Sequence, residues 1–136
     1  MKMPDRIDNI MLAPCGINCI ACYKHLKPKK ACEGCLAGDE YKPEHCRKCP
    51  IKDCTREKGI VHCFECKDFP CKRITSLEKS YTQRYGISLK QNSIMARNEG
   101  IDALMACDQQ RWACTRCGGI ISQHDKVCSE CGNPTE

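Results

Sequence analysis

The sequence has few of the residues from which a large apolar core is built. Aromatic side chains make up 5% of its 136 residues, and the mean hydropathy is −0.53. A chain of this length forms one domain, or one small domain with an appended module. Small chains that bury too little apolar surface are stabilised by disulfides, by metal ions or by partners.

The sequence also lacks a long apolar run. Residues 10–13 form a short apolar stretch behind acidic residues, too short for the core of a signal peptide or for a membrane span. No later segment is apolar enough for either role. We therefore expect a cytoplasmic protein that does not enter a membrane. In that reducing compartment, clustered cysteines bind metal more often than they form disulfides.

What the sequence does contain is cysteine, at 16 of 136 residues, a density typical of a cysteine-based scaffold. The formal charge of +5 assumes neutral thiols. Fifteen ligand thiolates on four Zn²⁺ ions would change this charge to about −2. The basic composition is thus weak support for a nucleic-acid partner, and we expect a protein partner, with the oligomeric state left open. One basic segment is interpreted as a solvated loop; its lysines are Lys24, Lys27, Lys29 and Lys30.

Cysteine density divides the chain into three regions. Residues 1–72 contain eleven cysteines among frequent Lys, Pro and Gly, which predicts a lobe of loops and short turns around metal. Residues 73–112 show helical periodicity, and residues 113–136 hold the last four cysteines. The predicted fold is a small, metal-stabilised α and irregular structure. It combines a cysteine-rich zinc-knuckle lobe, a short helical segment packed on it and a C-terminal zinc ribbon hairpin.

The middle region predicts two helices before residue 100. Apolar side chains at three- and four-residue steps form a stripe that ends at Gly86, and these are Ile74, Leu77, Tyr81 and Tyr85. Ser88 followed by Gln91 fits a capping box. It predicts a second helix through about Glu99, with Gly100 as its stop.

A third apolar stripe runs directly into Cys114; its members are Ile101, Leu104, Met105 and Trp112. We expect all three helices to pack a small core against the metal lobe. Trp112 is interpreted as the anchor between the last helix and the C-terminal segment.

The C-terminal region contains two Cys-x-x-Cys-Gly motifs, with ten residues between Cys117 and Cys128. Its four thiols are Cys114, Cys117, Cys128 and Cys131. Two tight turns that end at Gly118 and Gly132 would let four thiolates close a tetrahedron around one zinc ion. Because protein sulfur fills every position, this zinc is expected to be structural. His124, between the motifs, is interpreted as a solvent-facing loop residue.

The eleven cysteines of residues 1–72 fall into three triplets and one pair. The triplets are Cys15, Cys19 and Cys22; Cys46, Cys49 and Cys54; and Cys63, Cys66 and Cys71; the pair is Cys32 and Cys35. Eleven is one fewer than three four-ligand sites require, so each triplet must borrow a ligand from elsewhere. With the C-terminal site, the chain is expected to bind about three to four Zn²⁺ ions. The order of the cysteines leaves open which of them share a metal.

The twelfth ligand of the lobe is also left open. His45 and His62 each precede a cysteine in the repeated pattern His-Cys-x-x-Cys-x-x-x-x-Cys. Adjacent side chains of extended chain point to opposite sides, so both histidines are interpreted as flanking residues. His25 is a further candidate, and Cys107 is interpreted as a buried core thiol.

Iron is the alternative to zinc in this lobe. The Cys-x-x-Cys-Pro sequence at Cys49 resembles the edge of a ferredoxin motif, although a run of four close cysteines is absent. The triplet that begins at Cys15 has the spacing of the radical S-adenosylmethionine motif, but the chain is too short for that fold. An iron–sulfur or labile-metal redox or metal-sensing protein is therefore the second hypothesis, and a small zinc enzyme is the third. No catalytic or cofactor-binding residue is assigned.

The four N-terminal motifs together resemble a known family. Their order is Cys-Gly-x-x-Cys-x-x-Cys, Cys-x-Gly-Cys, Cys-x-x-Cys-x-Ile-x-x-Cys and Cys-x-Glu-Cys-x-Asp-Phe-Pro-Cys. This order is similar to that of a small cysteine-rich family of bacteria and archaea, described as a domain of unknown function to which zinc binding is attributed. Tyr-Gly-Ile-Ser-Leu and the Arg-Trp-x-Cys sequence resemble its longer members. The resemblance implies a cytoplasmic metal-binding protein and supplies no activity.

Overall fold

The computed structural model describes residues 1–27, 29–37, 40–42, 46 and 48–134. Helices and irregular chain make up these residues. The α-helices are α2 (Pro50–Glu57), α3 (Lys72–Tyr85), α4 (Leu89–Glu99) and α5 (Ile101–Arg111), and the short 3-10 helices are η1 (Asn9–Met11), η2 (Cys19–Ala21) and η3 (Cys63–Glu65). Within these ranges, no helix is both long enough and apolar enough to span a bilayer.

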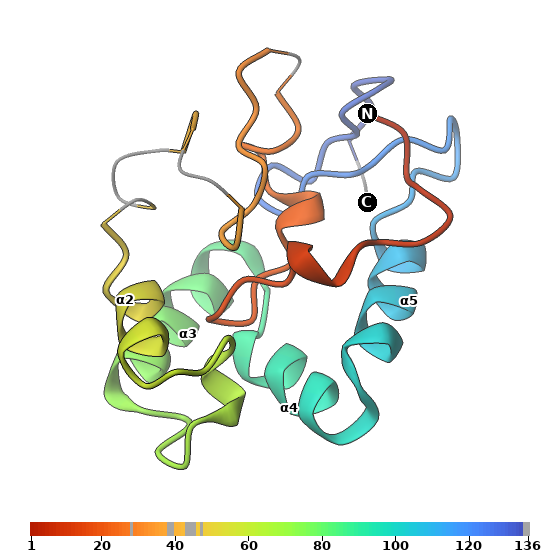
Figure 1. Cartoon of the computed structure of the whole chain (residues 1–136). Helices are drawn as coiled ribbons and strands as arrows, with labels where there is room; N and C mark the ends of the chain where they lie inside the picture. Colours follow the sequence, from red (N-terminus) through yellow and green to blue (C-terminus); the bar gives the residue numbers. More distant parts are fainter. Residues whose placement is uncertain (28, 38–39, 43–45, 47, 135–136) are drawn as a thin grey trace.

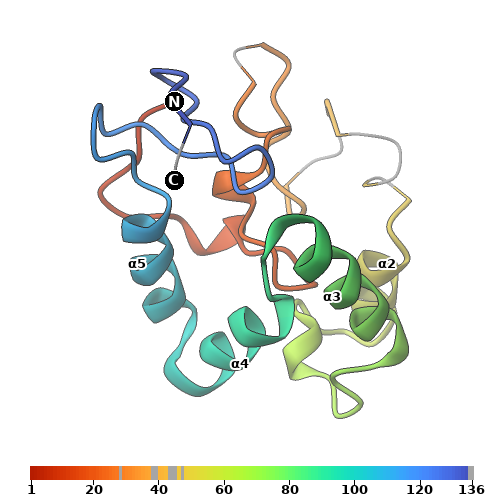
Figure 2. The same cartoon turned by 180° about the vertical axis from the view of Figure 1, so that it is seen from behind.

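Helices α3, α4 and α5 follow one another in an arc (Figures 1 and 2). α2 lies beside α3 at one end of the arc, and α5 lies at the other end. The N-terminal segment with η1 and η2 passes inside the arc (Figure 1). The helices therefore enclose the segment that carries the first cysteines.

The three helices predicted for the middle region are confirmed. α3 ends at Gly86, whose φ of 68° permits the left-handed turn that stops the helix. The hydroxyl of Ser88 accepts a hydrogen bond from the backbone N–H of Gln91 at 3.1 Å and so caps α4. The Glu78 carboxylate of α3 also accepts hydrogen bonds from this cap, from the Ser88 hydroxyl at 2.7 Å and the Lys90 N–H at 3.0 Å. These contacts fix the angle at which α3 meets α4.

α2 is an addition to the prediction, because residues 1–72 were expected to form loops and short turns. Pro50 occupies the first turn of α2, where its missing N–H costs no hydrogen bond. Asp53 lies in the first turn and Arg56 in the last, each at the end that the helix dipole favours for its charge. The sequence contains these helix signals, but the cysteines on either side of them indicated irregular chain instead.

One apolar core connects all parts of the chain. Its most buried members come from the N-terminal segment, the three helices and the C-terminal segment, and include Ile7, Leu12, Ile74, Leu89, Leu104 and Ile120. Asn18 is the polar centre of this core, with 1% of its surface exposed. Its side-chain amide donates to Asp108 of α5 at 3.1 Å, and its backbone carbonyl accepts from Gln123 at 2.9 Å. Asn18 thus joins η2 to α5 and to the C-terminal segment.

The C-terminal segment, residues 113–134, differs from the predicted zinc ribbon hairpin. Instead of two paired strands, its described residues form isolated antiparallel bridges, such as Ala113 with Ile120 and Ile121 with Cys128. A further bridge joins Lys2 to Gly119, so the N-terminal chain lies against this segment. Tight turns at both cysteine pairs and at residues 123–125 interrupt the extended chain, which leaves no room for a continuous ladder.

Trp112 connects α5 to the C-terminal segment, as predicted. Its side chain is 6% exposed, and its carbonyl accepts a hydrogen bond from the Ile121 N–H at 2.7 Å. The Arg111 guanidinium and the Lys126 ammonium lie 4.7 and 4.8 Å from the indole ring centroid. Two cations therefore cover the aromatic surface of the anchor.

His124 is not the solvent-facing residue that the sequence indicated. Its ring lies among the rings of Tyr23, Tyr81 and Tyr85, with centroid distances of 5.0, 5.7 and 4.7 Å. Burial lowers the pKa of His124 because it penalises the charged imidazolium. The histidine therefore joins the tip of the C-terminal segment to α3 and to the N-terminal lobe.

Candidate metal centre

The C-terminal segment holds its four cysteines on two similar turns. The Gly118 N–H donates to the Cys114 carbonyl at 2.9 Å, and the Gly132 N–H donates to the Cys128 carbonyl at 3.0 Å. Both glycines have a positive φ, 75° and 73°, in the left-handed region that closes each turn. Each turn therefore presents its two thiols to the same side.

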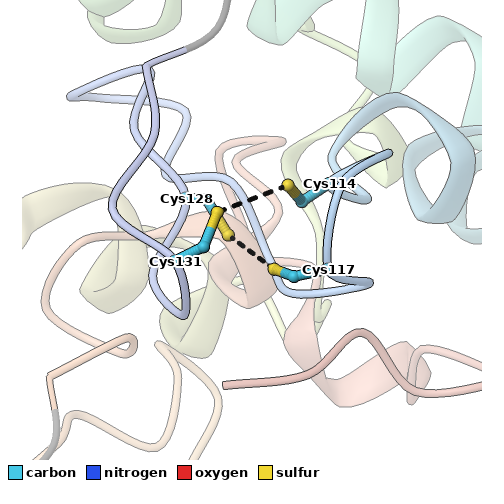
Figure 3. Close-up of side chains that lie close together, drawn as sticks. All are labelled: Cys114, Cys117, Cys128 and Cys131. Atoms are coloured by element: carbon cyan, nitrogen blue, oxygen red, sulfur yellow. Dashed lines mark hydrogen bonds between the residues drawn. The ribbon is translucent and has the colours of Figure 1, made fainter.

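The four sulfur atoms converge on one point (Figure 3). All lie within 4.8 Å of one another, with Cys114 to Cys131 at 3.8 Å and Cys117 to Cys128 at 3.5 Å. A tetrahedral zinc site with Zn–S bonds of about 2.3 Å separates its sulfurs by about 3.8 Å. The spacing fits such a site and greatly exceeds the length of a disulfide, about 2.05 Å. This Cys₄ group is a possible metal-binding site.

Backbone and side-chain N–H groups beside Cys114 and Cys131 favour the thiolate form of these two residues. The Asn133 backbone N–H and then its side-chain amide lower the pKa of Cys131 to about 6. Backbone N–H groups of Arg116 and Cys117 lower the pKa of Cys114. Because metal binds the thiolate, these hydrogen bonds reduce the cost of deprotonating the ligands.

Gly119 is required by close packing beside the same sulfurs. A Cβ atom at this position would lie 2.8 Å from the Cys128 sulfur and 2.8 Å from the Cβ of Glu130. The Gly119 N–H donates to the Cys117 sulfur at 3.4 Å. The absence of a side chain therefore allows the two turns to approach each other.

Part of the N-terminal set surrounds a larger cavity of about 140 Å³. Its lining includes four thiols, Cys15, Cys35, Cys46 and Cys49, together with apolar side chains of the lobe and of α3. Cys19 lies beside this group, with its sulfur 3.6 Å from that of Cys35. The hydrogen bond that Cys19 donates lowers the pKa of Cys35 against the effect of burial and, with the added effect of the Lys42 and Lys52 cations, the pKa falls to about 7.

Cys22 and Cys32 extend this larger group. Burial raises the pKa of Cys22, and the negative charges of Cys35 and Cys32 raise it further. Burial and then the same neighbours, together with Cys22 itself, raise the pKa of Cys46 to about 11. Seven of the eleven N-terminal thiols therefore interact as one group.

The remaining four N-terminal thiols line a smaller cavity of about 30 Å³; they are Cys54, Cys63, Cys66 and Cys71. Burial raises the pKa of Cys63 to about 12, and the charges of Cys71, Cys54 and Cys66 contribute in that order. α2 divides the first copy of the repeated motif, because Cys46 and Cys49 precede the helix and Cys54 lies within it. Cys54 of the first copy therefore lines the same cavity as the three thiols of the second copy.

The C-terminal set differs from both N-terminal groups in how closely its sulfurs approach. Within the described part of the chain, it is the one set of three or more Cys, His, Asp or Glu side chains whose ligand atoms all lie within 4.8 Å of one another. The structure thus brings the predicted ligand cysteines together in three groups. Only in the C-terminal group do the described sulfur atoms come close enough to share one ion.

The other candidate ligands have different surroundings. His62 is 6% exposed, stacks on Phe64 and contacts the Leu12 carbonyl through Nε2 at 3.1 Å, as a flanking structural residue would. His25 contacts the Cys32 carbonyl through Nδ1 at 2.6 Å. His45 lies outside the described residues. Cys107 is exposed on α5, so its interpretation as a core thiol is wrong.

Lys58 is a site residue that the sequence analysis did not identify. Its ammonium lies 3.1 Å from the Cys66 sulfur and 3.8 Å from a carboxylate oxygen of Asp68. Its position four residues after Cys54 on one helical face was the available signal. The role becomes visible once α2 is recognised as a helix.

Comparison with known proteins shows that the N-terminal part of the chain is similar to one family. Residues 11–76 match the model of a family described as a protein of unknown function (DUF3795). This range contains all eleven N-terminal cysteines and ends before the C-terminal Cys₄ group, so the similarity covers less of the chain than the sequence analysis indicated. Searches of curated proteins and of solved structures gave no match. The cysteine-rich lobe is therefore similar to a family of unknown function, and its chemistry has to be inferred from its own residues.

Proposed function

We propose that this chain is a cytoplasmic zinc-binding protein whose cysteine sites are structural, and that the surface they support is an interaction or regulatory module. The convergence of the four C-terminal sulfurs carries the proposal. Four protein ligands occupy all four coordination positions of a tetrahedral ion and leave no position for a reactive water. Such a site supports a fold and is unsuited to hydrolytic chemistry.

Zinc is the metal that this ligand set favours. Thiolates are soft ligands that select zinc, copper(I) or iron–sulfur clusters over magnesium and calcium. The spacing of the sulfurs agrees with the tetrahedral geometry of zinc. The two N-terminal groups supply ligands for further ions, which gives the proposed total of about three to four per chain.

The proposed partner is a protein. The negative charges of the ligand thiolates offset the positive charge of the chain, so little remains to attract a nucleic-acid backbone. Lys24 covers the ring of Tyr23 at 5.1 Å, so an aromatic side chain near the basic segment is already occupied by a cation. Nucleic acid is the weaker alternative because stacking surfaces are few.

Elemental analysis of the natively purified chain tests the metal assignment. We expect about three to four zinc atoms per chain and no acid-labile sulfide. A matched preparation of Cys131→Ser, which removes one C-terminal ligand, should contain one zinc fewer. Zinc-free protein with a full complement of reactive thiols and an unchanged fold would contradict the proposal.

An iron–sulfur or labile-metal protein with a redox or sensing role is the second candidate, favoured by the larger cavity. A volume of about 140 Å³ exceeds what one ion occupies, and Cys15, Cys35, Cys46 and Cys49 all face it. Apolar walls of this kind surround iron–sulfur clusters and control their potentials. Anaerobic purification followed by iron, sulfide and zinc analysis separates the candidates. Brown protein with acid-labile sulfide would assign this cavity to a cluster.

A further inference from the structure

We propose that Cys54, Cys63, Cys66 and Cys71 form a second mononuclear zinc site, independent of the C-terminal Cys₄ group. The inference extends the metal-binding part of the proposed function and assigns one ligand set among the eleven N-terminal cysteines. The four thiols line one cavity between α2, η3 and the start of α3.

Local structure holds each of these thiols at a defined position. Cys54 lies in the second half of α2, and the turn after this helix is closed by the Ile60 N–H donating to the Thr55 carbonyl at 3.0 Å. Cys63 begins η3, and Cys66 follows its last residue. Cys71 is the N-cap of α3. α2, η3 and the start of α3 therefore direct these cysteines toward the same space.

The Cys63–Cys66 turn repeats a feature of the C-terminal segment. The Asp68 N–H donates to the Cys66 sulfur at 3.4 Å, and the Gly119 N–H donates to the Cys117 sulfur at the same distance. In both places the acceptor is the second cysteine of a Cys-x-x-Cys pair, and the donor is two residues further along the chain. Hydrogen bonds of this type stabilise the charged form of a thiol. The turn is thus built like a metal-binding turn already described.

Lys58 supplies charge compensation for the same site. Four thiolates on one Zn²⁺ leave a net charge of −2. The Lys58 ammonium, 3.1 Å from the Cys66 sulfur, offsets part of this charge at the exposed side of the site. Because Lys58 follows Cys54 by one helical turn, α2 provides both a ligand and the compensating cation.

The cavity selects for a single sulfur-bound ion. Its volume of about 30 Å³ accommodates a body the size of a water molecule and is too small for a cluster. The lining other than cysteine consists of Thr55, Lys58, Ile60 and Phe69, so among the described residues no carboxylate faces the cavity. A ligand set of four thiolates without oxygen favours zinc over magnesium and calcium.

The four sulfurs are more widely spaced than those of the C-terminal set, since they do not all lie within 4.8 Å of one another. An ion has to draw the four sulfurs inward. The chain that connects α2 to α3 then becomes more compact. Metal binding and local folding are coupled in sites of this kind. The second site should therefore release its ion more readily than the C-terminal site.

Metal counting by native mass spectrometry of the full-length, zinc-loaded chain tests the proposal. Cys66→Ser, which changes a half-exposed thiol, should contain one zinc fewer than the unaltered chain. Cys131→Ser should also lose one zinc, the double variant should lose two, and the exposed Cys107→Ser control should lose none. Full zinc content in Cys66→Ser would overturn the second site. Full zinc content in Cys131→Ser with a loss in Cys66→Ser would refute the C-terminal assignment alone.

A measurement on the unaltered chain covers the case in which Cys66→Ser fails to fold. The zinc-loaded protein is titrated with a chelator, treated with iodoacetamide at each step, and digested for mapping of the modified thiols. We expect Cys54, Cys63, Cys66 and Cys71 to become reactive together as one ion leaves, at a lower chelator concentration than the C-terminal four. Modification of Cys54 or Cys71 while the other members of the set stay protected and the ion count is unchanged would overturn the proposal.

Discussion

The C-terminal segment and the α2–α3 region each bring four cysteine thiols together, but they use different lengths of chain to do so. In the C-terminal segment, two short turns ending at Gly118 and Gly132 bring four sulfurs within 4.8 Å of one another. In the α2–α3 region, Cys54, Cys63, Cys66 and Cys71 come from three helices and surround a cavity without closing on it. The comparison teaches that local turn geometry can bring four thiols to metal-binding distance, whereas the thiols of the α2–α3 region would need the proposed ion to draw them together.

Removal of all metal should have the largest effect on this comparison. With so few aromatic side chains, the chain depends on its sites, and structural zinc contributes about 10–16 kcal/mol in small domains at pH 7. Chelation should abolish cooperative thermal unfolding, followed by circular dichroism, and should expose all the cysteines of the lobe. Re-addition of zinc is the control and should restore the transition. An unchanged melting curve in the metal-free protein would refute the dependence on metal.

Gly119→Ala should weaken the preformed site and leave the α2–α3 region unaffected. The new Cβ would meet the Cys128 sulfur and the Glu130 side chain at 2.8 Å, so the two turns must move apart. We expect a loss of about 1–3 kcal/mol, typical of overpacking, measured by chemical unfolding of the zinc-loaded protein. Thr115→Ala, at an exposed position of the same segment, is the matched control. Equal stability of the two variants would show that the close approach of the turns is unimportant.

Lys58→Gln should act on the α2–α3 region alone. The Asp68 N–H and then the Lys58 ammonium lower the pKa of Cys66, so loss of the lysine raises this pKa and increases competition by protons. Zinc affinity at this site should fall by a few-fold at pH 7 and recover at higher pH, as measured with a competing chelator. Lys67→Gln changes a nearby exposed lysine without this contact and serves as the control. A variant that binds zinc as tightly as the control at pH 7 would argue against the role of Lys58.

The smallest expected effect is on the pH dependence of stability, through His124, which joins the C-terminal segment to α3. Burial lowers the pKa of His124, so this histidine stays neutral in the folded protein while the unfolded chain takes up a proton below about pH 6.5. The stability contributed by neutral His124 is therefore present above that pH and is lost as the pH falls through the folded pKa. His124→Phe should show a shallower decline of melting temperature between pH 7.5 and about pH 5.5. Thiolate protonation affects both proteins alike, so parallel declines would contradict this contribution.

The helical part of the fold was predictable because its signals are local. The apolar stripe from Ile74 to Tyr85 and the stop at Gly86 depend on residues within one helix, and α3 follows them. The cap at Ser88 located the start of α4 in the same way. α2 was missed although Pro50 marks its first turn, because eleven closely spaced cysteines suggested irregular chain throughout the lobe.

The cysteine groups were only partly predictable from the sequence. The C-terminal four could be grouped from spacing because both pairs lie on short turns. The N-terminal groups could not, since the orientation of α2 decides that Cys54 leaves its own triplet and faces Cys63. His124 and Cys107 were misjudged for a similar reason. Their exposure depends on how distant helices pack, and a lone residue carries no periodic signal.

The contact between the first residues and the C-terminal segment has a consequence for biosynthesis. The Met3 N–H donates to the Gly118 carbonyl at 3.0 Å, and Lys2 pairs with Gly119. Partners so far apart along the chain meet late, because the ribosome must first release the intervening residues. The nascent N-terminal lobe therefore emerges with its thiols exposed before this contact forms, and in that interval an ion bound at the proposed sites would protect the thiols from oxidation.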